Sequence, residues 1–149
     1  MKRIYLDHSA STPILPEVQD LMSDLSKNLY GNPSSIHREG VMAKNLLEEA
    51  RKSLALLLNA SSSQIFFTSG ATESNNIFLQ SEIRSEKYSH IVTTQIEHPS
   101  VLNTINNLAK ELKIKIDFLE LDSYGRINIS ELQKILNTNK NSLVSLMYV

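Results

Sequence analysis

The alternation of two hydrophobic periods after residue 63 is the feature that most limits the folds open to this chain. Short β-prone runs are separated by longer segments in which apolar residues recur at helical spacing. The predicted strands cover residues 64–68, 90–94, 115–121 and 143–149, and the predicted helices cover residues 72–87, 99–112 and 130–136. Strands separated by helices become parallel neighbours joined by right-handed crossovers. We therefore expect an α/β fold, a parallel sheet with helices on both faces.

Two further helices are expected before this alternation begins. Pro16 stands near the start of a segment that extends to Leu29, and proline is tolerated there because the first helical N–H is unpaired in any case. A turn-forming cluster at residues 30–35 separates it from a second helix, expected over residues 36–58. No linker-like or low-complexity run interrupts the chain, so we expect residues 1–149 to belong to one domain.

Composition narrows the class of protein. Hydrophobic residues make up 41% of the 149 residues and charged residues 21%, which is typical of a globular protein. The net charge of -1 offers no electrostatic reason to expect nucleic acid or an anionic membrane as a partner. No apolar run approaches the roughly 20 residues of a membrane span, and no secretory signal is recognisable, so we expect a cytoplasmic protein. The absence of cysteine excludes disulfides and thiolate metal sites within these residues, and we expect no metal site.

The last predicted strand bears on where the domain ends. Residues 143–149 are nearly all apolar, as expected of a strand buried on both faces of a sheet. In open α/β sheets the carboxyl ends of the strands carry the loops that bind ligands. A domain that stops on such a strand lacks those loops, so the sequence predicts an incomplete domain.

Residues 68–76, Thr-Ser-Gly-Ala-Thr-Glu-Ser-Asn-Asn, lead from a predicted strand into a predicted helix. Small residues allow the backbone to approach an anion, and the first N–H groups of a helix lack internal partners and carry the positive end of its dipole. The Thr72 hydroxyl could add a further donor. This arrangement indicates a phosphate site. The alternative is that Ser69 or Thr72 simply caps a helix.

Four segments in the same order resemble NifS/IscS-type cysteine desulfurases. They are Ile-Tyr-Leu-Asp-His-Ser-Ala-Ser-Thr-Pro at 4–13, Gly-Asn-Pro-Ser-Ser-Ile-His at 31–37, the segment at 68–76, and Glu-His-Pro-Ser-Val at 97–101. Weaker similarity continues through residues 122–127 to the end of the chain. The resemblance implies a fold-type I, class-V enzyme that depends on pyridoxal 5'-phosphate (PLP). Residues 1–149 would then be the N-terminal portion of its large domain, which lies before the PLP-bound lysine.

The family's roles are carried over residue by residue. Ala71 and Thr72 match the positions that hold the PLP phosphate through backbone N–H groups and the threonine hydroxyl. His98 matches the histidine that stacks on the pyridine ring and shuttles protons, a task suited to a flat ring that titrates near neutrality. The implied substrate is L-cysteine, whose sulfur serves iron–sulfur cluster assembly. Selenocysteine lyases share the fold and stay open as an alternative.

The other three histidines are weaker candidates. His8 departs from the family pattern, in which asparagine is usual, and Ser11 replaces a usual threonine. His37 matches a frequent family residue in a loop near the dimer interface and the substrate entrance. His90 precedes a predicted strand, and we expect it to face solvent. Asn32 and Ser34 could contact a ligand, although a turn explains their loop equally well.

Several residues that the family needs have no counterpart in these 149 residues. The chain holds no cysteine to accept a persulfide, and none of its lysines lies in a motif that matches the PLP lysine. The aspartate that pairs with the pyridine nitrogen is missing as well. PLP chemistry depends on that lysine and that carboxylate. We therefore expect the chain alone to be inactive as a desulfurase.

Three hypotheses for the role of the chain remain open. It could be one fragment of a split desulfurase, whose companion chain carries the lysine and the cysteine. It could be a degenerate product of a longer ancestral gene. It could also be a non-enzymatic module that associates with an intact desulfurase chain. In each case an apolar edge left by the last strand would favour association with a partner.

Overall fold

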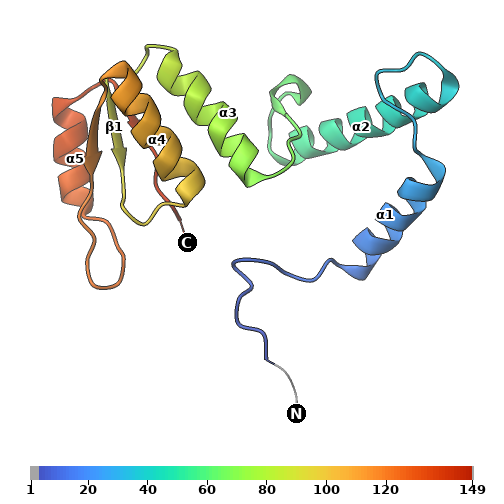
Figure 1. The fold of residues 1–149 in the computed structure, drawn as a ribbon, viewed down its shortest axis with the longest axis horizontal. Coiled ribbons are helices and arrows are strands. Elements are labelled where there is room, and N and C mark those ends of the chain that lie inside the picture. The colour runs from blue at the N-terminus through green and yellow to red at the C-terminus, as the bar shows by residue number, and fades with distance from the viewer. Residues whose placement is uncertain (1–3, 149) are drawn as a thin grey trace. The chain divides into compact units, whose positions relative to one another are not determined.

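The computed structural model describes residues 4–148 and divides the chain into two compact units, Met1–Phe66 and Phe67–Val149. The first unit is helical and the second contains the sheet (Figure 1). Among the described residues, no helix is both long enough and apolar enough to cross a membrane. The two units are described separately.

The first unit contains the helices α1 (Pro16–Asn28) and α2 (Arg38–Leu57) and the short 3-10 helix η1 (Ser62–Gln64). Proline lies in the first turn of α1, as the sequence predicts. His37 caps α2, because its side chain accepts a hydrogen bond from the Gly40 N–H. Both predicted helices are confirmed within two residues at each end.

The predicted strand over residues 64–68 is wrong. Gln64 ends η1, and residues 65–68 belong to no strand in the described part of the chain. Ser61 and Gln64 form a capping box that bends the backbone into a turn. A β-prone run becomes a strand only where a neighbouring strand accepts its hydrogen bonds, and Phe66 is 80% exposed.

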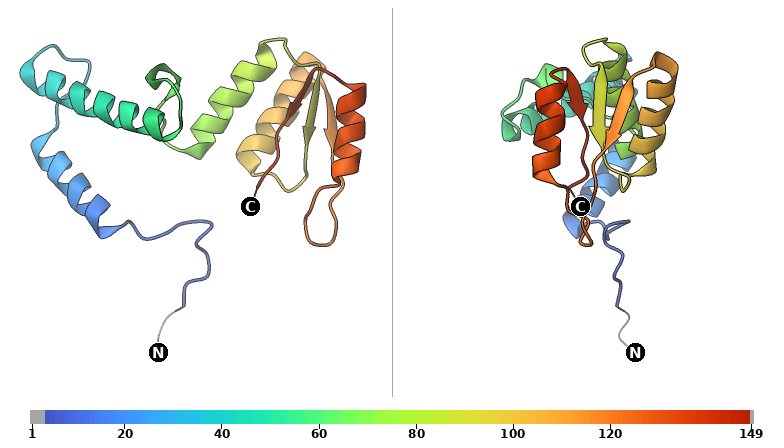
Figure 2. Two further views of the ribbon diagram at one scale, coloured as in Figure 1. Left: turned by 180° about the vertical axis from the view of Figure 1, so that it is seen from behind. Right: turned by 90° about the vertical axis from the view of Figure 1, so that its left-hand side faces the viewer.

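The second unit is a three-layer α/β arrangement, as expected. Its elements are α3 (Ala71–Arg84), β1 (His90–Thr93), α4 (Pro99–Leu112), β2 (Lys115–Phe118), α5 (Ile129–Thr138) and β3 (Ser142–Val144). The strands lie in the order β2-β1-β3, and both pairings are parallel. Figure 2 shows α4 and α5 on opposite sides of this sheet. The part of the last predicted strand at residue 149 lies outside the described residues.

One face of the sheet forms the core of this unit. Ile91 of β1 and Leu143 of β3 pack there with apolar residues of α3 and α4. The buried members of this cluster are Leu79, Ile83, Ile91, Val101, Ile105, Leu108, Ala109 and Leu143. Side chains of a strand alternate between faces, so residues 90, 117 and 142 belong to the other face.

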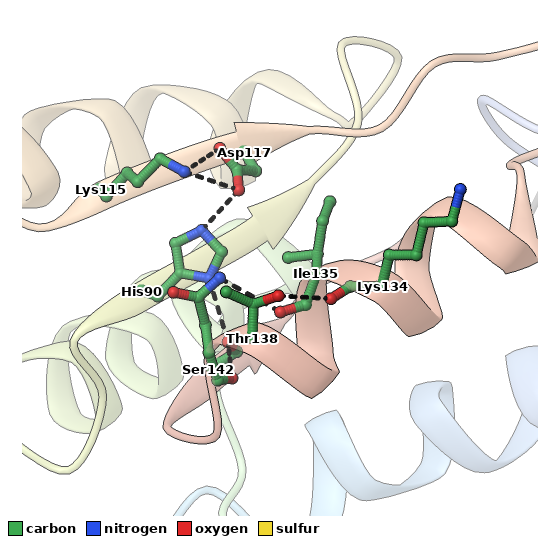
Figure 3. Close-up of polar contacts among 8 residues, drawn as sticks. His90, Lys115, Asp117, Lys134, Ile135, Thr138 and Ser142 are labelled. Carbon is green, nitrogen blue, oxygen red and sulfur yellow. Dashed lines mark hydrogen bonds and ion pairs between the residues drawn. The ribbon is translucent and has the colours of Figure 1, made fainter.

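His90 does not face solvent, contrary to the sequence prediction. It is the first residue of the central strand and only 2% exposed. Its Nε2 lies 2.9 Å from Asp117 Oδ2 on β2, and its Nδ1 lies 3.0 Å from Ser142 Oγ on β3 (Figure 3). The neighbouring strands cover the ring on both sides, and both ring nitrogens find partners. His90 therefore links the three strands.

The ionised carboxylate of Asp117 makes the stability of the second unit depend on pH. The hydrogen bond from the Lys115 ammonium, with the charges of Lys115 and His90, holds the pKa of Asp117 below its usual value, although burial opposes the shift. A carboxyl whose pKa is depressed on folding adds stability above its unfolded pKa of about 3.9. That stability is lost as the pH falls through the folded pKa.

On acidification, we expect the free energy of unfolding of the second unit to fall further in the wild-type chain than in the Asp117→Asn variant. The measurement is amide hydrogen exchange of β1 and β2 from about pH 5 down to about pH 2, the range in which a depressed carboxyl titrates. Asp24→Asn, on α1 in the first unit, is the control for a generic loss of negative charge. Equal losses for the wild type and Asp117→Asn would contradict the prediction.

Candidate functional site

The N-terminus of α3 carries the predicted phosphate donors. Gly70 precedes the helix and offers no side chain to cap it. Among the described residues, no group accepts a hydrogen bond from the N–H of Ala71 or Thr72, and the Thr72 hydroxyl makes none either. These groups are therefore available at the positive end of a 14-residue helix.

The capping alternative does not describe this helix. The backbone N–H and the hydroxyl of Ser69 both donate to Glu73 Oε2, each at 2.7 Å. The hydroxyl of Thr68 lies 2.7 Å from that of Ser74. These contacts use up the polar groups beside the turn and leave the donors of Ala71 and Thr72 free. The same Ser69 bonds lower the pKa of Glu73, so this carboxyl stays ionised and turned toward Ser69.

His98 lies at the N-terminus of α4 and is exposed. The ring caps this helix, because Nδ1 accepts the backbone N–H of Ser100 at 3.1 Å. The Ser100 hydroxyl lies 2.8 Å from the same nitrogen. Pro99 occupies the first turn, where its missing N–H costs nothing. The ring is thus held by Nδ1, which leaves Nε2 as its outward group.

Side chains of Asn75 and Asn76 join the two helices that carry these groups. Asn75 Nδ2 donates to Ser100 Oγ at 2.9 Å, and Thr104 Oγ1 donates to Asn76 Oδ1 at 2.8 Å. Asn76 Nδ2 also donates to the carbonyl of Thr72 at 2.8 Å. Below these bonds the apolar sides of α3 and α4 pack in the shared core. The helix starts at Ala71 and Pro99 are therefore held in a fixed relation.

Glu97 is a site-forming residue to which the sequence reasoning gave no role. It is 7% exposed, and its carboxylate accepts hydrogen bonds from the Met147 backbone N–H and, at 3.4 Å, from the Thr94 hydroxyl. Glu97 thereby ties the loop before His98 to the segment that follows β3. A glutamate in the loop after an apolar strand was the available signal, but its partner lies 50 residues further along the chain.

The other candidates lie in the first unit. His8 is exposed, with its ring edge-on to Tyr5 at a centroid distance of 5.1 Å. His37 serves as the helix cap described above, and Asn32 Oδ1 accepts the Ser34 N–H in a turn. These contacts give His37 and Asn32 local structural roles. Among residues 4–148, no three histidine or carboxylate side chains are grouped so that they could hold a metal ion.

The donor set of the second unit fits the groups of PLP. Free N–H groups and a free hydroxyl at a helix N-terminus suit the phosphate dianion. A flat ring held at one edge by Nδ1 suits stacking on a pyridine ring. Ala71 and Thr72 could hold the phosphate and His98 could cover the ring.

Comparison with known proteins identifies the family of the chain. The family model described as aminotransferase class-V matches residues 4–149. The chain belongs to the class-V aminotransferase family. Enzymes of this class depend on PLP.

Several class-V relatives are cysteine desulfurases. The chain is 40% identical over 151 residues to cysteine desulfurase IscS of Dictyoglomus turgidum. This match covers 99% of the chain and 38% of that protein. The chain is also 40% identical to the mitochondrial cysteine desulfurase of Drosophila melanogaster. That match covers 98% of the chain and 32% of the relative. The chain thus spans well under half the length of these relatives.

Solved structures with related descriptions share the fold of this chain. A NifS-like protein superimposes with a TM-score of 0.86 at 36% identity, over 98% of this chain and 40% of that one. The structure described as SspA in complex with cysteine superimposes with a TM-score of 0.83 at 31% identity, over 97% of this chain and 42% of that one. The α/β fold predicted from sequence is confirmed.

Proposed function

We propose that this chain forms the phosphate-binding and ring-stacking part of the PLP site of a cysteine desulfurase. The observation that carries the proposal is the pair of free N–H groups at Ala71 and Thr72, joined to His98 through the α3–α4 hydrogen bonds. PLP, when bound, would supply an electron sink for the bonds at the substrate's α-carbon. Residues 1–149 would together belong to the N-terminal portion of the large domain.

Each residue has a defined task in this proposal. The N–H groups of Ala71 and Thr72 and the Thr72 hydroxyl bind the phosphate and fix the position of the cofactor. The His98 ring covers one face of the pyridine and excludes water from it. Its Nε2 is the atom that holds or moves a proton, because Nδ1 is engaged by Ser100.

L-cysteine is the substrate that the relatives favour. The relatives described above carry the name cysteine desulfurase, and one structural neighbour is described as a complex with cysteine. We propose that the complete site takes sulfur from L-cysteine for iron–sulfur cluster assembly. Selenocysteine is the competing substrate, and a direct comparison of sulfide and selenide release would separate the two.

We further propose that these 149 residues need a complementary polypeptide. They contain no cysteine that could accept the sulfur, and no lysine stands in a motif that matches the PLP lysine. The remaining length of the relatives is where both would be supplied. The partner in this proposal is a desulfurase segment or chain that carries that lysine and cysteine.

Incubation of the purified chain with PLP and L-cysteine should release no more sulfide and alanine than PLP alone does. Addition of a complementary segment that carries the lysine and cysteine should produce alanine and, when a thiol reductant is present to reduce the persulfide on that cysteine, sulfide in an equal amount. The same segment with its lysine replaced by alanine is the control. Sustained turnover by the 149-residue chain alone would contradict the prediction.

A second candidate function is a binding module for an intact desulfurase. The observation in its favour is the run Leu56-Leu57-Leu58 at the end of α2, whose side chains are 83%, 81% and 67% exposed within the described residues. Consecutive exposed leucines are unusual on a free surface and typical of an interface. Co-purification of the chain with an intact desulfurase, lost in Leu57→Glu, would support this function.

A further inference from the structure

The donor and acceptor roles in the hydrogen bonds around His98 can be assigned in only one consistent way. Nδ1 accepts the backbone N–H of Ser100, so its lone pair points toward residue 100 and the nitrogen carries no proton. The Ser100 hydroxyl, 2.8 Å from this nitrogen, must then be the donor in that contact. The oxygen of the same hydroxyl accepts the Asn75 amide at 2.9 Å. The chain of donors therefore runs from Asn75 through Ser100 to His98.

We infer that Asn75 and Ser100 are positioning residues that hold the neutral His98 ring as the tautomer with its proton on Nε2. This inference deepens the proposed function, on which its catalytic meaning rests. An Nε2–H on the exposed edge gives the ring a proton to donate, whereas the opposite tautomer would present a lone pair there. Asn75 on α3 and Ser100 on α4 set this choice, although neither would touch the cofactor itself.

The geometry separates this role from ordinary helix capping. Capping of α4 requires only the backbone N–H of Ser100, which any residue at position 100 other than proline supplies. The hydroxyl adds a second donor to the same lone pair, and Asn75 orients that hydroxyl by occupying its acceptor side. Ser100 and Asn75 are partly buried where they meet, so water competes weakly for either group.

The test is the tautomer ratio of His98, read from the ring nitrogen chemical shifts of the 15N-labelled full chain. The spectrum is recorded at about pH 8.5, where an imidazole is largely neutral, and His98→Gln assigns the signals. The wild type should show a protonated Nε2 and an unprotonated Nδ1. Ser100→Ala should lower the ratio of this tautomer to the other about fivefold, the effect of one net hydrogen bond.

Two variants distinguish positioning from a general structural effect. Ser100→Thr keeps the hydroxyl and should restore the wild-type ratio. Thr104→Val removes the side-chain bond of Thr104 to Asn76, another bond between α3 and α4, and should leave the ratio unchanged. Asn75→Ala should shift the ratio in the same direction as Ser100→Ala, and it carries the test if Ser100→Ala fails to fold.

The inference is overturned if Ser100→Ala leaves the ratio unchanged, if Ser100→Thr fails to restore it, or if Thr104→Val lowers it equally. The proposed function is tested separately by fluorescence titration of the wild-type chain with PLP. A chain that binds no PLP but shows the expected ratios would sink the proposed function and keep the tautomer assignment. If the wild-type chain binds PLP but Ser100→Ala leaves the tautomer ratio unchanged, the proposed function is kept and the tautomer assignment is overturned.

Discussion

Replacement of Ala71 by proline is expected to weaken PLP binding about 30-fold while α3 stays folded. Proline removes only the backbone N–H of the first helical residue, a position where it is well tolerated. Both α1 and α4 of this chain already carry proline in the first turn. A hydrogen bond to a charged group contributes about 1.5–3 kcal/mol, equivalent to roughly a 10- to 150-fold change in affinity.

The local backbone makes this substitution a clean test. Gly70 is extended, with φ 163 and ψ 179, and the residue before a proline favours an extended conformation. The N–H of Ala71 has no partner in the described part of the chain, so its removal breaks no existing hydrogen bond. Any loss of binding therefore reports on a bond to the ligand.

The measurement is a titration of each variant with PLP, followed by the change in PLP fluorescence. Ile129→Pro is the matched control, because it makes the same change at the first residue of α5, away from the site. Circular dichroism checks that both variants keep their helices. Equal affinities for Ala71→Pro, Ile129→Pro and the wild type would rule out the Ala71 N–H as a phosphate donor.

Replacement of His90 by alanine is expected to lower the free energy of unfolding of the second unit by about 3 kcal/mol, on the scale of buried large-to-small changes. The substitution removes hydrogen bonds to Asp117 and Ser142 and leaves a cavity in the central strand. Ser142 Oγ keeps its bond to the Asn139 carbonyl at 2.7 Å, and Asp117 keeps Lys115. The lost free energy of unfolding therefore comes mainly from the packing and the hydrogen bonds of the His90 ring.

Amide hydrogen exchange at β1, β2 and β3 is the appropriate measurement, because it reports on the second unit alone. Lys115→Ala is the control, since the Lys115 side chain is 67% exposed and its pairing with Asp117 contributes less than about 1 kcal/mol. A loss below about 1 kcal/mol for His90→Ala, the range of a single hydrogen bond, would mean that the ring does not join the strands.

The sequence determined the parts of the structure that depend on neighbours along the chain. Hydrophobic periodicity located the helices and the three paired strands, although it extended the last two strands beyond Phe118 and Val144, and it predicted parallel pairing because helices separate the strands. The turn of small residues before Ala71 indicated a phosphate site but left open that Ser69 or Thr72 caps the helix, and the structure shows no side-chain cap there. The predicted roles of Ala71, Thr72 and His98 in binding PLP stay predictions.

Tertiary structure decided what depends on residues far apart. Periodicity does not reveal strand order, so only the order β2-β1-β3 showed that His90 is buried between two neighbours. Residues 65–68 have the composition of a strand, yet a strand forms only beside another strand, and the described sheet of β2, β1 and β3 does not include them. The Asn75–Ser100 and Glu97–Met147 bonds span 25 and 50 residues. Such contacts follow from packing, because no local rule brings those side chains within hydrogen-bonding distance.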